Sequence, residues 1–201
     1  MKEGLHVLEK FTPILDIDGP LAGFDDELYR RCEAAGFAFA DGVTSVETQK
    51  SRYLTDDITD KAHRRTARDW TEAEGWFREL PVVAGAQEGV DSMLSRGWDV
   101  YLCTKPLAAN PTCRDEKAAW VGEHFPDLKE KLVITADKSI VRGHILLDDA
   151  IKLSWLETAY WTPVVFSAAY NGPGSQWERL PRWTWGDSLS ILHTLGGFRG
   201  A

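Results

Sequence analysis

The sequence predicts an α/β fold in which a parallel β-sheet is flanked by helices and a small helical cap is inserted after the first strand. Beyond residue 80, short apolar runs alternate with helical patterns, which is typical of βα units and of a parallel sheet. Several of these runs end in polar residues, at the edge where open α/β sheets place their sites. A polar, helical stretch separates the first two predicted strands. These three observations predict a sheet domain with an insert.

Strands are expected at 12–17, 99–104, 132–136, 144–148 and 163–167. The first helix is expected at 25–35, because Leu28 and Cys32 lie four residues apart and Gly36 can end the helix. Further helical patterns cover 59–74, 87–95, 114–124 and 188–195. The sheet domain is therefore expected to comprise 1–25 and 81–201, and the cap 26–80.

Length and composition agree with an ordinary soluble globular protein. At 201 residues the chain can bury a full core as one α/β domain with a small insert, and 43% hydrophobic with 27% charged residues is ordinary for that class. The formal net charge of −8 argues against a surface that coats nucleic acid. Three cysteines without zinc spacing, no signal peptide and no apolar run long enough for a bilayer favour reduced thiols and a cytoplasmic location.

The most informative segment is ILDIDGPLAGF at 14–24, in which Asp16 and Asp18 end the first apolar run. Because side chains alternate along a strand, both carboxylates can point to one spot where the strand opens into its loop. Two close carboxylates repel each other unless a cation lies between them, and all-oxygen ligation suits Mg²⁺. Gly19 lets the chain turn away without a Cβ clash.

Three later strands also end in polar side chains: Thr104 after the second, Asp137 and Lys138 after the third, and Asp148 with Asp149 after the fourth. A phosphoryl-transfer site needs one aspartate to attack phosphorus, a metal and a lysine to balance oxyanion charge, and a hydroxyl to orient the phosphate. Each group alone is common at strand ends, but the four in this order indicate such a site.

This order of motifs resembles the haloacid dehalogenase (HAD) superfamily of phosphohydrolases, and the surrounding strings resemble the 5′(3′)-deoxyribonucleotidase family. The matching strings are DIDGPLAGF at 16–24, LCTKPL at 102–107, EKAAWV at 116–121, TADK at 135–138, LLDD at 146–149, VFSAAYN at 165–171 and the WTW region at 183–185. The similarity covers nearly the whole chain and is thin between 40 and 75. It implies a HAD-like Rossmannoid fold and a phosphatase of (deoxy)ribonucleoside 5′-monophosphates.

The resemblance also implies roles for the acidic residues. Asp16 is the expected nucleophile, forming an aspartyl-phosphate, and Asp18 the residue that protonates the leaving nucleoside oxygen and then activates water. Mg²⁺ is expected to bind the carboxylates of Asp16 and Asp149 and the backbone carbonyl of Asp18, while Asp148 has a supporting role. The roles of Asp148 and Asp149 can also be exchanged.

Several further residues are expected to contact the substrate. Thr104 and Lys138 would bind the phosphate, and Lys117 lies in a matching string. Two positions depart from the family's pattern, since Lys105 replaces a serine and Ala136 stands where an arginine is frequent. Lys105 would either tighten phosphate binding or point to solvent, and Ala136 removes a substrate contact. These departures concern substrate preference more than the reaction.

Aromatic residues suggest what the cap recognises. Phe24 matches a base-contacting phenylalanine of the family, and Tyr53, Trp70 and Trp76 offer faces that can stack on a nucleobase, with core packing as the alternative for each cap aromatic. The expected partner is a small phosphate monoester, with neither a nucleic-acid polymer nor a membrane. The sequence leaves open base and sugar preference and the oligomeric state, a homodimer included.

Three other functions share some of these features. A HAD phosphatase for a small sugar phosphate or another phosphate monoester would have the same core motifs and is the main alternative. A receiver domain of a signalling relay opens with its acidic pair, whereas here D-x-D-G comes first and Asp-Asp last. A non-catalytic binding protein is disfavoured because all four catalytic positions are present.

Overall fold

A six-stranded parallel sheet forms the centre of the computed structural model, which describes residues 10–171 and 179–180. The strands are β1 (Pro13–Leu15), β2 (Tyr101–Thr104), β3 (Leu132–Ile134), β4 (Ile145–Asp148), β5 (Thr162–Phe166) and β6 (Arg179–Leu180), in the order β3-β2-β1-β4-β5-β6. All neighbouring pairs run parallel, which confirms the predicted fold class.

The five predicted strands are present, and two of them, β1 and β3, end two residues earlier than expected. β1 stops at Leu15 because the amide of Ile17 turns back to the carboxylate of Asp16 at 2.8 Å. β3 stops at Ile134 because Asp137 starts a tight turn, its carboxylate accepting the amide of Ser139 at 3.0 Å. In both cases an aspartate side chain captures a backbone N–H that would otherwise continue the ladder.

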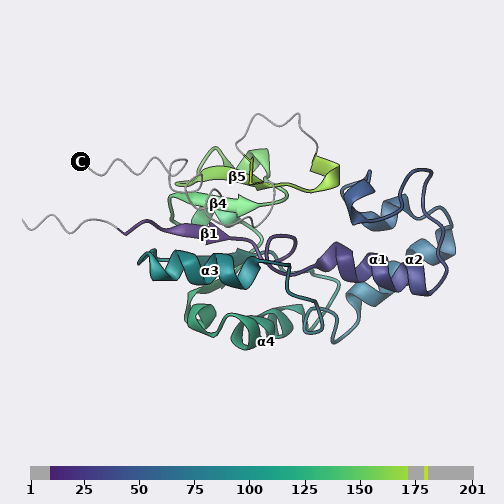
Figure 1. The fold of residues 1–201 in the computed structure, drawn as a ribbon, viewed down its shortest axis with the longest axis horizontal. Helices are drawn as coiled ribbons and strands as arrows, with labels where there is room; N and C mark the ends of the chain where they lie inside the picture. Colours follow the sequence, from purple (N-terminus) through teal and green to yellow (C-terminus); the bar gives the residue numbers. More distant parts are fainter. Residues whose placement is uncertain (1–9, 172–178, 181–201) are drawn as a thin grey trace, which may run out of the picture.

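Strand residues alternate between two apolar layers. One layer, which contains Leu15, Leu102 and Leu147, includes buried residues of α3 (Ala86–Ser95) and α4 (Cys113–His124). Figure 1 shows these two helices along one side of the sheet. The other layer places Ile14, Cys103 and Leu146 against Trp155 and Trp161, from the segment between β4 and β5. The core therefore covers both faces, as a parallel sheet requires.

The strand order places a topological switch between β1 and β4. The chain moves outward from β1 through β2 to β3, then returns to the other side of β1 and continues through β4 to β6. Connections on the two sides of the switch cover opposite faces, so a crevice is left beyond the carboxyl ends of β1 and β4. The predicted Asp16 and Asp148–Asp149 motifs follow these two strands.

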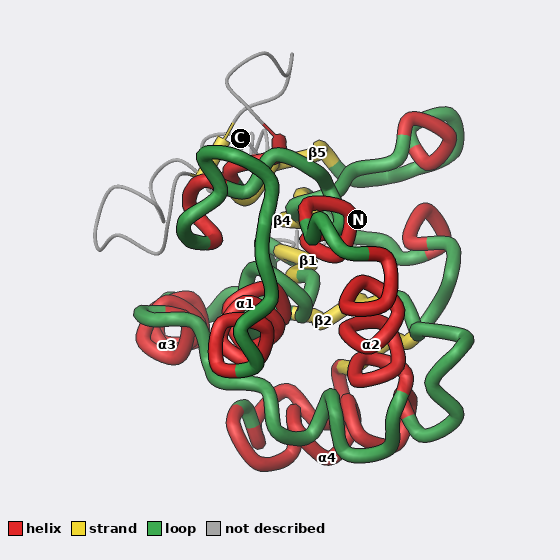
Figure 2. Tube along the Cα trace, turned by 90° about the vertical axis from the view of Figure 1, so that its right-hand side faces the viewer, coloured by secondary structure: helices red, strands yellow, loops and turns green. Residues whose placement is uncertain are grey.

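The segment between β1 and β2 contributes α1 (Phe24–Ala34), the short 3₁₀ turns η1 (Val46–Thr48) and η2 (Leu54–Asp57), and α2 (Lys61–Glu72). These elements lie beyond the carboxyl ends of the strands, to the right in Figure 1, and Figure 2 looks at the strands past α1 and α2. The helices agree with the patterns at 25–35 and 59–74. The assignment of 26–80 to a separate cap domain stays a prediction, and the expected helix at 188–195 and the WTW region lie outside the described residues.

The end of this insert is tied to α4. The buried carboxylate of Glu116 accepts the backbone amides of Gly75 at 2.6 Å and Phe77 at 2.9 Å. Asn110, just before α4, donates to the carbonyl of Ala73 at 2.7 Å, and the indole of Trp120 donates to the carbonyl of Leu80 at 2.8 Å. The segment 73–80, which leads from the insert back to the sheet and belongs to no helix or strand, is therefore held by hydrogen bonds from side chains on and next to α4.

All three cysteines are free and buried, on three different elements: Cys32 on α1, Cys103 on β2 and Cys113 at the start of α4. Burial raises the pKa of Cys32 to about 11 and that of Cys103 to about 12. Their role in this fold is packing.

In the described part of the chain, no helix is both long and apolar enough to cross a bilayer.

Candidate active site

The loop after β1 places the first motif. The amide of Asp16 still bonds to Leu147 of β4 at 2.8 Å, after which the chain turns through Gly19, whose φ is +93°. A Cβ at Gly19 would lie 3.2 Å from Cγ of Asp149, so the glycine is needed both for the turn and for the close approach of the two motifs. The strand ends and this glycine together bring Asp16 next to the acidic pair.

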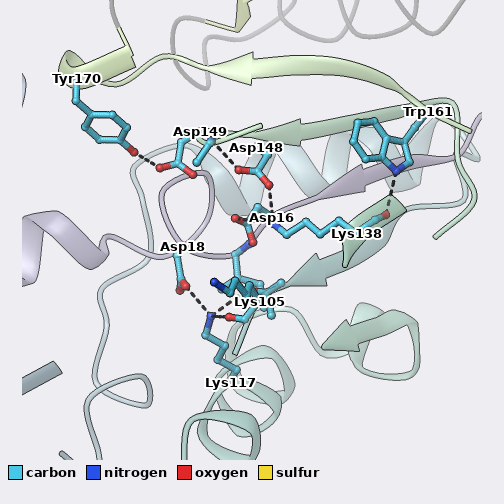
Figure 3. A network of polar contacts seen from close by, with 12 residues as sticks. Asp16, Asp18, Lys105, Lys117, Lys138, Asp148, Asp149, Trp161 and Tyr170 are labelled. Carbon is cyan, nitrogen blue, oxygen red and sulfur yellow. Dashed lines mark hydrogen bonds and ion pairs between the residues drawn. The ribbon is translucent and has the colours of Figure 1, made fainter. Parts of the chain in front are cut away.

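Three carboxylates meet at this point. One oxygen from each of Asp16, Asp148 and Asp149 lies within 4.8 Å of the others, although the residues come from two strands and are far apart in the sequence. Figure 3 shows them facing one another at the ends of β1 and β4. The spacing matches a small site for a hard cation, because all three donors are carboxylate oxygens.

Lys138 places a positive charge directly against this group. Its buried Nζ lies 2.8 Å from Asp16 and 2.6 Å from Asp148, while the indole of Trp161 donates to its backbone carbonyl at 3.1 Å (Figure 3). Burial alone would lower the pKa of Lys138, but the two carboxylates outweigh it and raise that pKa above its usual range. The lysine is therefore a fixed cation.

One lysine does not balance three carboxylates. Burial raises the pKa of Asp16 to about 6 against the opposing effect of Lys138, and the nearby Asp148 adds to the rise. Burial, with the nearby charges of Asp148 and Asp16, raises the pKa of Asp149 well above its ordinary value. Groups with this excess of negative charge favour an additional cation. The donor set and its charge therefore fit a bound Mg²⁺.

Asp149 is also held by Tyr170, for which no role was predicted. Tyr170 lies on η6 (Ala169–Asn171), four residues beyond β5, and its hydroxyl donates to the Asp149 carboxylate (Figure 3). Asn171 donates to the backbone carbonyl of Asp149 at 3.0 Å. The position of Tyr170 just after a strand end was the signal that could have found it.

Asp18 points away from the three-carboxylate group toward Lys117. Nζ of Lys117, which is 1% exposed, lies 2.5 Å from Oδ2 of Asp18 and 2.9 Å from the hydroxyl of Thr104. It also donates to the backbone carbonyl of Lys105 at 2.9 Å. Oδ1 of Asp18 is buried without a hydrogen-bond partner among the described residues. Lys117 therefore links the loop after β1, through Asp18, to the end of β2 and the loop after it, through Thr104 and Lys105.

A cavity of about 1190 Å³ opens above these groups and extends under the insert. The predicted site residues that line it are Asp16, Asp18, Phe24, Tyr53, Lys105, Lys138, Asp148 and Asp149. Predicted residues from the sheet and from the insert therefore line the same cavity. The cavity is much larger than a phosphate group and leaves room for a larger organic substituent.

Two predicted aromatic contacts are not brought to this cavity. Trp70 stacks on Phe37 with ring centroids 5.3 Å apart, and Trp76 is 2% exposed, with its ring 5.4 Å from that of Phe24. Neither tryptophan is among the described residues that line the cavity. Both pack inside the insert instead, and Trp76 supports Phe24 edge-on.

The structure adds polar residues from the insert that the sequence did not single out. Asp25, Gln49 and Arg52 line the cavity. The amide of Gln49 lies 3.3 Å from the carboxylate of Asp25, and burial raises the pKa of Asp25 to about 7, although that hydrogen bond opposes the rise. Arg52 belongs to an irregular loop, where no periodic pattern could mark it.

Comparison with known sequences gives consistent results. The model of the family described as 5′ nucleotidase, deoxy (pyrimidine), cytosolic type C protein matches residues 13–192. A putative 5′(3′)-deoxyribonucleotidase from Bordetella pertussis is 30% identical over 183 residues, covering 88% of this chain and 94% of that protein. The human mitochondrial 5′(3′)-deoxyribonucleotidase is 32% identical over 165 residues, covering 79% of this chain and 71% of that protein.

Solved structures with the same fold include two hydrolases described as haloacid dehalogenase-like. The protein from Burkholderia xenovorans is 13% identical, with a TM-score of 0.51 over 96% of this chain and 100% of its own. The one from Xanthomonas campestris is also 13% identical, with a TM-score of 0.51 over 94% of both chains. At this identity the likeness concerns the fold alone.

Proposed function

The chain belongs to the 5′(3′)-deoxyribonucleotidase family of HAD-type phosphoric monoester hydrolases, and we propose that it is an Mg²⁺-dependent phosphatase of (deoxy)ribonucleoside 5′-monophosphates that works through an aspartyl-phosphate. The observation that carries the proposal is the meeting of Asp16, Asp148 and Asp149 around Lys138 on the floor of one large cavity. A carboxylate nucleophile, a fixed cation and an oxygen-only metal site are the parts that phosphoryl transfer requires.

Asp16 is the proposed nucleophile. A carboxylate oxygen of Asp16 attacks phosphorus, the bond from phosphorus to the nucleoside oxygen breaks, and the aspartyl-phosphate forms. The ammonium of Lys138, 2.8 Å from Asp16, remains next to the reacting group and offsets negative charge on the phosphoryl oxygens. The backbone of the β1 loop fixes the nucleophile, since its other carboxylate oxygen accepts the amide of Ile17.

Asp18 is the proposed acid and base. Lys117 holds Oδ2, which leaves Oδ1 to give a proton to the departing nucleoside oxygen and then to take one from the water that hydrolyses the aspartyl-phosphate. Phosphate leaves with the second proton transfer, and both carboxylates return to their starting state.

The proposed metal site uses Asp16, Asp149 and the backbone carbonyl of Asp18, with Asp148 oriented by Lys138 and by the amide of Ala150 at 2.7 Å. When bound, Mg²⁺ would balance carboxylate and phosphate charge and act as a Lewis acid on a phosphoryl oxygen.

The insert and the residues that lead into it supply the proposed nucleotide selectivity. Phe24, half-buried at the start of α1, lines the cavity and is supported by Trp76, while Tyr53 lines it from the loop before η2 and is 62% exposed. Aromatic faces at the cavity wall suit a flat base. We therefore propose that residues 26–80 act as a substrate-binding cap.

A panel of substrates tests the reaction. Deoxyribonucleoside 5′-monophosphates, ribonucleotides, small sugar phosphates and p-nitrophenyl phosphate should be assayed for phosphate release, with Mg²⁺ and after chelation. We expect nucleotides to be hydrolysed with the highest kcat/KM and chelation to abolish turnover, because the carboxylates would be left uncompensated. Preference for sugar phosphates would favour the other HAD phosphatase function, and full activity in chelator would contradict the metal site.

Removal of the Phe24 ring tests base recognition. Phe24→Ala should lower kcat/KM for a nucleotide by an amount that corresponds to about 1–3 kcal/mol, the scale of a base–aromatic stack. The loss should be nearly absent for p-nitrophenyl phosphate, which has no base. Equal losses on both substrates would mean that Phe24 only supports the β1 loop.

A further inference from the structure

We propose that Arg52, on the loop between η1 and η2, binds the phosphate group of the substrate from the cap side. This inference rests on the proposed function and deepens it, because it adds a phosphate-binding residue that is supplied by the insert and not by the sheet. Four observations support it: the charge of the cavity floor, the pairing of the other cations, the location of the loop and the way in which the loop is held.

The ammonium groups next to the carboxylates of the site are already paired. Four carboxylates and two ammonium groups lie in the cavity floor or directly beneath it, and both ammonium groups contact carboxylates. These residues are Asp16, Asp18, Asp148, Asp149, Lys117 and Lys138. A divalent cation would bring this set to neutrality, and a phosphate monoester dianion would then leave it negative. Tight phosphate binding therefore needs cations from elsewhere in the cavity.

The cationic side chains that line the cavity are Arg52, Arg68, Lys105, Lys138 and Lys152. Lys138 is committed to Asp16 and Asp148, and Arg68 forms an ion pair of 2.8 Å with Asp56. Arg52 forms no ion pair of this kind with any described residue; its guanidinium lies 5.5 Å from the ring centroid of Tyr53. Of the two described cap arginines that line the cavity, Arg52 is therefore the one whose charge is available to an anion.

Arg52 faces the same cavity as the acidic floor, since Arg52, Asp149 and Tyr170 all line it. The loop that carries Arg52 follows η1, and η1 packs against η6, the turn that carries Tyr170. Arg52 therefore borders the cavity at the side where the insert meets the turn that carries Tyr170, the partner of Asp149.

The loop is held by buried polar groups. Gln49, which is 3% exposed, donates from its amide to the carbonyls of Ser51 at 2.8 Å and Arg52 at 3.3 Å. The carboxylate of Asp57, which is 4% exposed, accepts the amides of Lys50 at 2.8 Å and Ser51 at 3.1 Å. The backbone of Arg52 is thus fixed, while its long side chain, which lines the cavity, can present a planar fork that matches phosphate.

Calorimetric titration with inorganic phosphate, in the presence of saturating Mg²⁺, tests this role without turnover. Arg52→Gln should weaken phosphate binding by about 10- to 100-fold, the effect of losing a charge-assisted contact. Arg52→Lys should recover part of the affinity, since it keeps the charge and loses the fork. Arg68→Gln, which removes another cap arginine lining the same cavity, is the matched control and should change affinity by less than about 2-fold.

Steady-state kinetics separates phosphate binding from base binding. We expect Arg52→Gln to raise KM by similar factors for a nucleotide and for p-nitrophenyl phosphate. Unchanged phosphate affinity, a loss confined to the nucleotide, or an equal loss in Arg68→Gln would each overturn the proposal. If the wild-type chain released phosphate from no ester, the proposed function would fail, and the phosphate titration would still decide the role of Arg52. Circular dichroism of each variant verifies the fold.

Discussion

Asp16→Asn should reduce phosphate release from any phosphate monoester by several orders of magnitude, because the amide keeps the size of the side chain but is a far weaker nucleophile than the carboxylate. The assay is single-turnover and steady-state phosphate release at saturating Mg²⁺. Asp127→Asn, the same chemical change at an exposed position, is the matched control and should leave turnover unchanged. Near-normal turnover of Asp16→Asn would rule out the aspartyl-phosphate.

This loss should not come from unfolding. Burial raises the pKa of Asp16 to about 6, which means that its surroundings disfavour the charged form in the folded protein. An uncharged amide removes that cost and also the repulsion from Asp148. The metal-free Asp16→Asn protein is therefore expected to melt at the same temperature as the wild type or higher, and a clearly lower melting temperature would contradict the buried-charge interpretation.

Lys138→Met is expected to have the second largest effect. It removes the ammonium that contacts both Asp16 and Asp148 and leaves these buried carboxylates without that compensation. Breaking a buried ion pair on one side typically costs about 3–5 kcal/mol, so the metal-free variant should lose about that much free energy of unfolding. Urea unfolding at neutral pH measures it, and phosphate release should be nearly lost as well.

The control is Lys131→Met, which breaks the ion pair with Asp99 at a position where both side chains are about one-third exposed. Its cost should be about 0–1 kcal/mol, the range of exposed pairs. Mg²⁺ should restore part of the stability of Lys138→Met, because it supplies positive charge to the same carboxylates, and should do nothing for Lys131→Met. Similar losses in both variants would mean that Lys138 acts only by packing.

The sheet and the floor of the site were predictable because both follow from short-range rules. Short apolar runs between helical patterns predicted the strand positions. The rule that sites lie at the carboxyl ends of parallel strands then predicted that Asp16, Lys138 and the Asp148–Asp149 pair lie together. The strand lengths were less predictable, because β1 and β3 end where aspartate side chains capture backbone amides. Such a capture depends on side-chain geometry that a residue pattern does not contain.

The contacts made by long side chains could not be predicted without the three-dimensional structure. Lys117 is 99 residues from Asp18 in the sequence, and nothing in the string around it shows that its Nζ crosses to that carboxylate and to Thr104. Trp70 and Trp76 were equally uncertain, because an aromatic residue in a helical insert can face either the cavity or the insert's own core. Both face the core.

The three buried cysteines are natural probes of local unfolding, because the rate at which each thiol is labelled reports how frequently the structure around it opens. A thiol reacts as the thiolate, so Cys32 and Cys103, with pKa values of about 11 and 12, can be labelled only after the surrounding structure opens to water. Because the sulfurs lie on α1, β2 and the start of α4, the labelling rate of each one measures the stability of a different region. A nucleotide that holds the insert against the sheet would slow the labelling of Cys32, with no engineered probe needed.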